Sequence, residues 1–251
     1  MKNSLSLMQL IVAIFLSGVL LPGSVSAALI NRGGGLIFDD VLNVTWLQDA
    51  NYAFTSGYST ADGGAMPWAD ANAWAAQLSY FDSVRNVSYT GWRLPTVRPI
   101  NGSGFIYPGA YDGSTDYGYN VGAPGTLYAG STGSELAYMY FTNLGNISFY
   151  DTTGTAQPGY GEVNSGPFIN VVRETWSSTE YAPNQIGAWT FINYGVLSGF
   201  QDWYPKVNDL SAWAVHDGDI AGAVPEPASL FLLGFGIVGL GFSRRRKQKA
   251  A

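Results

Sequence analysis

The chain has 251 residues, contains no cysteine and carries a formal net charge of −6. Half of its twelve basic residues lie near the two ends, so residues 28–223 hold six basic and seventeen acidic side chains, a net charge of −11. This charge argues against nucleic acid as a partner. The lack of cysteine excludes disulfides, thiol nucleophiles and thiolate metal sites. All eight tryptophans lie between the ends, which indicates a core stabilised by large aromatic side chains.

The N-terminus has the pattern of a secretory signal peptide. Lys2 precedes an apolar stretch over residues 10–21, and Val25-Ser26-Ala27 supplies the small residues that signal peptidase requires. The apolar stretch is shorter than a membrane-spanning helix needs to be. We therefore expect residues 1–27 to be removed by signal peptidase after Ala27.

Residues 28–223 predict a single α+β domain. Short β-type runs over 28–37 and 44–47 precede a helix that Pro67 opens and that apolar residues at helical spacing extend to Phe81. Residues 101–133 predict a long ordered loop, because they combine glycine and turn residues with many tyrosines. A capping-box pattern over 132–135 then predicts a second helix that Gly145 ends.

The C-terminal part of this domain predicts strands. Short β-type runs cover residues 171–177, 188–192 and 211–215, and residues 195–203 have a hairpin-like pattern. Helices followed by a β-rich end are typical of the α+β class.

The C-terminus has three parts in a fixed order. Val224-Pro225-Glu226-Pro227 precedes fifteen uncharged residues, 228–242, and a basic cluster follows, formed by Arg244, Arg245, Arg246 and Lys247. At ~1.5 Å per residue the apolar segment is shorter than the ~30 Å hydrocarbon core, so it would span a membrane only marginally. The basic cluster predicts that this end stays in the cytoplasm. The ordinary alternative is a permanent C-terminal anchor.

This three-part tail closely resembles the PEP-CTERM sorting signal, also known as the ice-binding protein C-terminal motif. The resemblance implies export in a Gram-negative bacterium and recognition of Pro225-Glu226-Pro227 by an exosortase. It also implies transient anchoring in the inner membrane, delivery to the cell surface or the extracellular matrix, and an association with exopolysaccharide. The second name of the motif is no evidence that this chain binds ice.

The exported domain resembles the C-terminal domain family of Legionella collagen-like adhesins, which is similar in turn to the C-type-lectin-like fold of formylglycine-generating enzymes. The resemblance depends on the order of five strings, namely Phe38-Asp39-Asp40, Val44-Thr45-Trp46, Gly91-Trp92-Arg93-Leu94-Pro95-Thr96, Trp176-Ser177-Ser178-Thr179-Glu180-Tyr181 and Ala212-Trp213-Ala214-Val215. It implies a surface-exposed domain, and some family members bind glycans. Two departures matter. His216-Asp217 stand where the family often has a basic residue, which weakens any inference of polyanion binding, and formylglycine chemistry needs cysteine.

The aromatic residues supply the candidate glycan site. Sugars stack on exposed aromatic rings that polar side chains frame. Trp203 with Gln201 and Asp202 is therefore the first candidate, and Tyr117, Tyr119 and Tyr128 in the long loop come next. Five tryptophans at core-like positions are expected to pack instead, namely Trp74, Trp92, Trp176, Trp189 and Trp213.

A calcium site is a further hypothesis. Asp112 and Asp116 lie in a run with oxygen-bearing side chains at alternate positions, although Tyr117 and Ala123 stand where an EF-hand has glycine and glutamate. A second possibility is a cluster of Asp39, Asp40 and Asp49. Turn formation by Asp, Ser and Gly is the favoured explanation of both runs.

Catalysis finds little support in the sequence. His216 is the only histidine, and its place before Asp217-Gly218 is typical of a turn. Glu174 and Glu180 could form the carboxylate pair of a glycosidase, but paired acids are also common on solvated loops. Arg93 is expected to pair with a buried acid. We therefore expect no enzyme and no obligatory cofactor, and predict a glycan- or matrix-binding module. The alternatives are a structural biofilm-matrix protein and, less favoured, a polysaccharide hydrolase.

Overall fold

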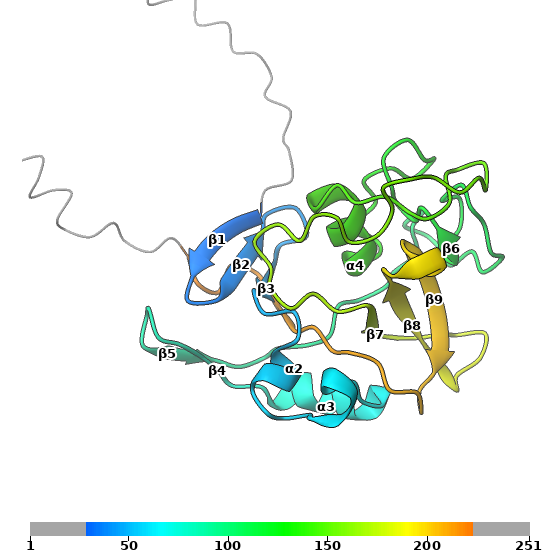
Figure 1. The fold of residues 1–251 in the computed structure, drawn as a ribbon. Helices are drawn as coiled ribbons and strands as arrows, with labels where there is room; N and C mark the ends of the chain where they lie inside the picture. The colour runs from blue at the N-terminus through cyan, green and yellow to red at the C-terminus, as the bar shows by residue number, and fades with distance from the viewer. Residues whose placement is uncertain (1–28, 223–251) are drawn as a thin grey trace, which may run out of the picture.

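Two antiparallel four-stranded sheets organise the computed structural model, which describes residues 29–222 (Figure 1). The first sheet has the order β1-β2-β3-β10, with β1 (Leu29–Gly33), β2 (Leu36–Asp39), β3 (Val44–Leu47) and β10 (Val215–Asp217). The second has the order β6-β9-β8-β7, with β6 (Gly118–Tyr119), β7 (Glu174–Glu180), β8 (Gly187–Ile192) and β9 (Phe200–Pro205). The predicted signal peptide and sorting tail lie outside the described residues.

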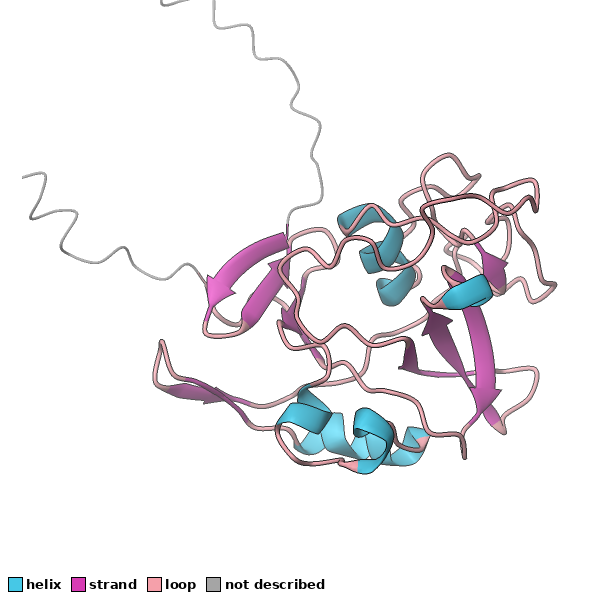
Figure 2. Cartoon of the chain, viewed as in Figure 1, coloured by secondary structure: helices cyan, strands magenta, loops and turns pink. Residues whose placement is uncertain are grey.

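Helices and a separate hairpin surround the sheets, and long loops join them (Figure 2). The helices are α2 (Tyr52–Thr55), α3 (Trp68–Gln77) and α4 (Glu135–Tyr138), with short 3-10 turns at Ala61–Gly64 and Gly195–Leu197. The hairpin consists of β4 (Tyr80–Asp82) and β5 (Val87–Tyr89). Short helices with mostly antiparallel strands agree with the predicted α+β class.

The first predicted helix is confirmed, with an earlier end. Pro67 is the N-cap residue of α3, and Ala71, Trp74 and Ala75 are buried as the spacing predicted. Leu78 has an extended backbone and ends the helix. The chain then enters β4, so Phe81 is an exposed strand residue and not part of the buried helical face.

The second helix does not begin with the capping box predicted over 132–135. Ser134 is the N-cap, and its side chain accepts a hydrogen bond from the Ala137 N–H at 3.2 Å. Glu135 does not reach back to the helix start, because its carboxylate binds Arg93 and the Thr96 N–H. After one turn the helix widens into a π-helix over Met139–Asn143, whose wider turn ends near Gly145.

The hairpin predicted over 195–203 is not formed within that segment. The pairing in this region joins β8 to β9, and the segment 193–199 is the connection between these strands. The loop over 101–133 is ordered, as predicted, and pairs with β9 through β6. Asp116 holds it together, because its carboxylate accepts hydrogen bonds from the N–H groups of Ile100 and Ile106 at 2.6 and 2.7 Å.

Aromatic residues form the core between the sheets. Trp213 packs against Trp46 and Phe168 with ring centroids 4.7 and 4.8 Å apart, and donates its indole N–H to the Leu47 carbonyl at 2.8 Å. The segment 210–217 bridges the two sheets, because Ser211 pairs with Thr175 beside β7 and Val215 pairs with Trp46 of β3. All five tryptophans predicted to pack are at most 4% exposed.

Candidate functional site

The residues predicted around Trp203 lie on two faces of one strand. Along β9, side chains alternate, and the register pairs Asp202 with Thr190 but Trp203 with Trp189. Asp202 therefore points to the opposite side of the sheet from Gln201 and Trp203. Sequence neighbours in a strand cannot converge on one ligand surface, so the structure divides the predicted site.

Gln201 and Trp203 belong to the packed side of β9. Gln201 is fully buried and donates its side-chain N–H to the Asp116 carbonyl at 2.7 Å, so the structure places it in the interior and not on a binding surface. Trp203 is half-buried and stacks on Tyr181 with centroids 4.8 Å apart and an interplanar angle of 6°. One face of its ring is thus already covered.

Asp202 meets Tyr117, which also packs against the cluster of Val97, Tyr181 and Trp189 that Trp203 joins. Tyr117 directly precedes β6, whose Gly118 pairs with Gln201, and its hydroxyl hydrogen-bonds the Asp202 carboxylate. Burial raises the pKa of Asp202 to about 6, while hydrogen bonds from the Trp203 N–H and Tyr117 limit the shift and the charge of Glu174 adds to it. Asp202 is therefore a hydrogen-bonded carboxylate with an ionisation close to neutral pH.

Three further residues extend this arrangement. Tyr204 is two residues beyond Asp202 on the same face, and Glu174 of β7 accepts a hydrogen bond from Tyr194. Burial, with the charges of Glu174 and Asp202, raises the pKa of Tyr204 to about 12, so its hydroxyl remains a donor. We call Tyr117, Glu174, Tyr194, Asp202 and Tyr204 the acidic tyrosine face.

An open pocket of about 440 Å³ adjoins this face. Glu174 and Tyr194 line it together with Arg173, Asp209 and Ser211. The guanidinium of Arg173 lies 6.0 Å from the centre of the Tyr194 ring. The pocket therefore presents an aromatic ring, a hydroxyl, carboxylates and one cation to solvent.

Tyr119 packs inside an aromatic group instead of facing solvent. It is 7% exposed, donates its hydroxyl to the Val196 carbonyl at 2.7 Å, and stacks on Tyr111 with an interplanar angle of 4°. Tyr111 is 47% exposed. The predicted Tyr119 thus supports a surface ring that the sequence reasoning did not select.

The aspartates considered for calcium have structural partners. Asp112 is exposed and accepts a hydrogen bond from the Ser114 N–H at 3.0 Å, whereas Asp116 is fully buried beneath the loop that it holds. In the second cluster, Asp39 is also buried and accepts hydrogen bonds from the Val41 and Leu42 N–H groups. Within residues 29–222, no three acidic or histidine side chains lie close enough together to hold a metal ion.

The predicted pairing of Arg93 with a buried acid is confirmed. Its guanidinium donates two hydrogen bonds of 2.8 Å to Glu135, which is 3% exposed, and two to Asp217 at 2.6 and 2.9 Å. Burial alone would lower the pKa of Arg93, but these carboxylates hold it above its usual range. Arg93 fastens the chain before the long loop to α4 and β10.

The structure gives the positions of the two candidates for catalysis, the pair of Glu174 and Glu180 and the single His216. Glu174 and Glu180 stand at opposite ends of β7, and their partners Ile192 and Ala188 are four residues apart on β8. At ~3.3 Å per residue the two glutamates therefore lie roughly 13 Å or more apart, beyond the ~5–9.5 Å of a glycosidase pair. Glu180 instead binds Lys206 at 2.7 Å. The His216 ring contacts the Asp217 carbonyl at 2.7 Å and packs edge-on against Trp92.

Comparison with known proteins identifies the tail. The PEP-CTERM protein-sorting motif matches residues 223–247. This motif implies processing by an exosortase, export and membrane-associated sorting toward the cell surface, as the predicted tail required. No curated protein and no solved structure matches the chain, so the resemblance to the Legionella adhesin family stays a prediction.

Among residues 29–222, no helix is long and apolar enough to cross a bilayer. The predicted apolar segment 228–242 and the basic cluster Arg244 to Lys247 lie outside the described residues.

Proposed function

We propose that residues 28–223 form a non-catalytic glycan-binding module that exosortase sorting delivers to the cell surface or to an exopolysaccharide matrix. The acidic tyrosine face is the observation that carries this proposal. It places tyrosine rings and two carboxylates on one side of a sheet, beside an open pocket. The lectin-like fold belongs to the same proposal and depends on the five ordered strings of the sequence.

The chemistry of this face fits a neutral or amino sugar. Aromatic rings pack against the C–H face of a pyranose, and carboxylates accept hydrogen bonds from its hydroxyls. Among residues 29–222, Arg173 is the only basic side chain lining the pocket, and Glu174 and Asp209 line it too. A polyanionic glycan would meet net repulsion there, which argues for an uncharged ligand.

A glycan array with the 28–223 fragment tests the proposal, with and without calcium. We expect binding to a neutral polysaccharide that falls at least tenfold in Tyr204→Ala, and that weakens as the pH falls through about 6, where Asp202 gains a proton. Leu127→Ala is the matched control, because Leu127 is 75% exposed and outside this face. Binding to no glycan in either condition contradicts the proposal.

A hydrolase is the second candidate, and one observation favours it. Asp202 has a pKa near neutrality and interacts with the charge of Glu174, as an acid and its partner carboxylate do in a glycosidase. This reading predicts that the fragment degrades a bound polysaccharide and that Glu174→Gln or Asp202→Asn abolishes the degradation. A stable bound glycan contradicts it. A structural matrix protein would instead self-associate in sedimentation experiments without binding any glycan.

A further inference from the structure

The hairpin β4–β5 carries an exposed apolar tip. Phe81 and Val84 are each 56% exposed, and Val87 is 39% exposed. The register pairs Phe81 with Ser88 and Asp82 with Val87, so Phe81 and Val87 point to opposite sides of the ribbon while Val84 lies in its turn. A tip that is apolar on both sides suits entry into a fluid apolar phase better than contact with one flat protein surface.

The tip also presents no free charge. Between Tyr80 and Tyr89 the charged residues are Asp82 and Arg85, and they bind each other at 2.6 Å. Asp82 is fully buried and also accepts hydrogen bonds from the Val84 and Arg85 N–H groups. The remaining polar residues of the turn, Ser83 and Asn86, are uncharged.

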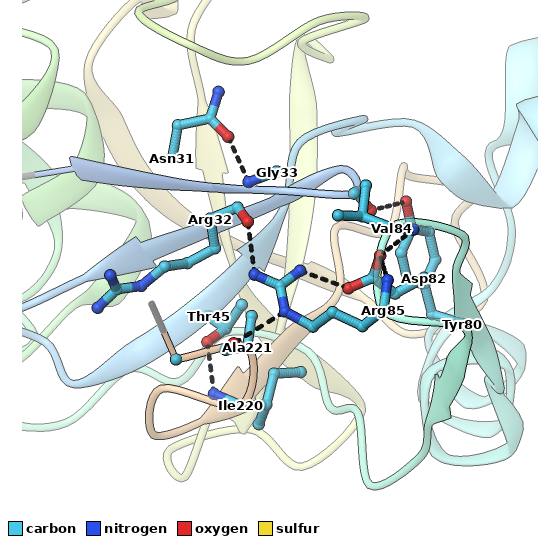
Figure 3. A network of polar contacts seen from close by, with 12 residues as sticks. Asn31, Arg32, Gly33, Thr45, Tyr80, Asp82, Val84, Arg85, Ile220 and Ala221 are labelled. Atoms are coloured by element: carbon cyan, nitrogen blue, oxygen red, sulfur yellow. Dashed lines mark hydrogen bonds and ion pairs between the residues drawn. The ribbon is translucent and has the colours of Figure 1, made fainter. Parts of the chain in front are cut away.

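Arg85 fastens this hairpin to the place where the chain leaves the fold (Figure 3). Its guanidinium donates to the Ala221 carbonyl at 2.9 Å and to the Arg32 carbonyl at 2.6 Å. Arg32 in turn forms an ion pair with Asp219. The hairpin, the first strand and the last described residues are therefore held together as one unit.

The sorting tail begins directly after this unit. Only the five residues 223–227 separate Gly222 from the apolar segment, so an extended chain spans roughly 20 Å between them. Figure 1 shows both ends of the described chain and the β4–β5 hairpin on one side of the fold, and β6 and β9 on the other. A tail held in a bilayer must keep the hairpin close to the lipid surface.

We infer that Phe81, Val84 and Val87 enter the lipid surface of the membrane that holds the sorting tail. This inference rests on the membrane-held tail of the proposed function. Three side chains form too small an apolar surface to hold the domain unaided, but the short tether makes their contact intramolecular. The domain then stands with its acidic tyrosine face away from the bilayer, and it detaches once the tail is removed.

The natural absence of cysteine gives a direct experiment. The full chain carrying Val84→Cys is labelled with a polarity-sensitive fluorophore and reconstituted into vesicles of phosphatidylethanolamine and phosphatidylglycerol that contain a lipid-bound quencher. Val207→Cys is the matched control, because Val207 is 82% exposed two residues beyond the end of β9, away from the hairpin. We expect quenching at position 84 to exceed that at position 207 severalfold.

Two failures can be told apart by vesicle flotation. Loss of the chain from the vesicles refutes the membrane-held tail and the inference with it. Retention of the chain on the vesicles with equal quenching at both positions refutes the inference alone. Quenching at position 84 that appears only after an exosortase is added refutes it as well. Because the charges of the tip are paired, the quenching should persist in phosphatidylcholine vesicles and in high salt. Its loss there would overturn apolar insertion.

Discussion

At Arg93, two carboxylates surround one guanidinium, and the buried Glu135 has a cation and a backbone N–H as partners. At Asp202, a half-buried carboxylate has a tyrosine hydroxyl and a backbone N–H as partners, and the charge of another acid, Glu174, acts on it. Burial acts on both sites, yet the neighbouring carboxylates hold the pKa of Arg93 above its usual range, whereas burial raises the pKa of Asp202 to about 6. The Arg93 cluster, formed by Arg93, Glu135 and Asp217, joins the chain before the long loop to α4 and β10. The acidic tyrosine face instead keeps hydrogen-bonding groups that a ligand can use.

Removing the cation from the first region should have the largest effect. Arg93→Ala leaves Glu135 buried without a counter-charge, and the loss of one partner of a buried pair typically destabilises by about 3–5 kcal/mol. Urea denaturation of the 28–223 fragment measures this loss in the free energy of unfolding. A value below about 1 kcal/mol, which is usual for exposed pairs, would show that the Arg93 cluster is no more than a surface contact.

In the acidic tyrosine face, removal of the Asp202 charge should instead raise the free energy of unfolding. The pKa of Asp202 is raised to about 6, so the folded state holds this proton more tightly than the unfolded chain, whose aspartate pKa is about 3.9. The stabilisation that Asp202 contributes is therefore at its maximum below about pH 4, where the carboxyl is protonated. It is lost as the pH rises through 6, which lowers the free energy of unfolding by about 2–3 kcal/mol.

Asp202→Asn tests this linkage. The variant should be more stable than the natural chain at pH 7.5, and the difference should shrink toward pH 4.5. Denaturation curves at three pH values measure it, and taking the difference cancels the contributions of other carboxylates. If the free energy of unfolding changed with pH in the same way in both proteins, ionisation of Asp202 would cost no stability, and the contrast with Arg93 would not hold.

The smallest effect is expected at Lys206. Its ion pair is with Glu180, whose side chain is 50% exposed, and its ammonium lies 4.6 Å from the Trp68 ring centre. Lys206→Ala should destabilise by at most about 1 kcal/mol, because solvent screens exposed pairs. It serves as the surface reference for Arg93→Ala, and a comparable loss in both variants would remove the distinction between buried and exposed ion pairs.

The candidate site shows where prediction from the sequence ended. Asp202 and Tyr117 were selected from composition and do meet, but Gln201 was selected with them although strand alternation buries it. Alternation could have indicated Tyr204, which is two residues from Asp202 on the same strand. Glu174 could not have been found in this role, because only the pairing of β7, β8 and β9 brings it into the electrostatic surroundings of Asp202.

What the sequence determined by itself is local. The sorting motif, the cysteine-free acidic composition, the start of α3 at Pro67 and the packing of five tryptophans all depend on short strings or on side-chain chemistry. The tertiary structure alone decided which side chains share a surface. Sheet pairing joins residues far apart in the chain and so assembled the acidic tyrosine face. A side-chain hydrogen bond from Arg85 to the Ala221 carbonyl fastened the hairpin to the chain shortly before the tail.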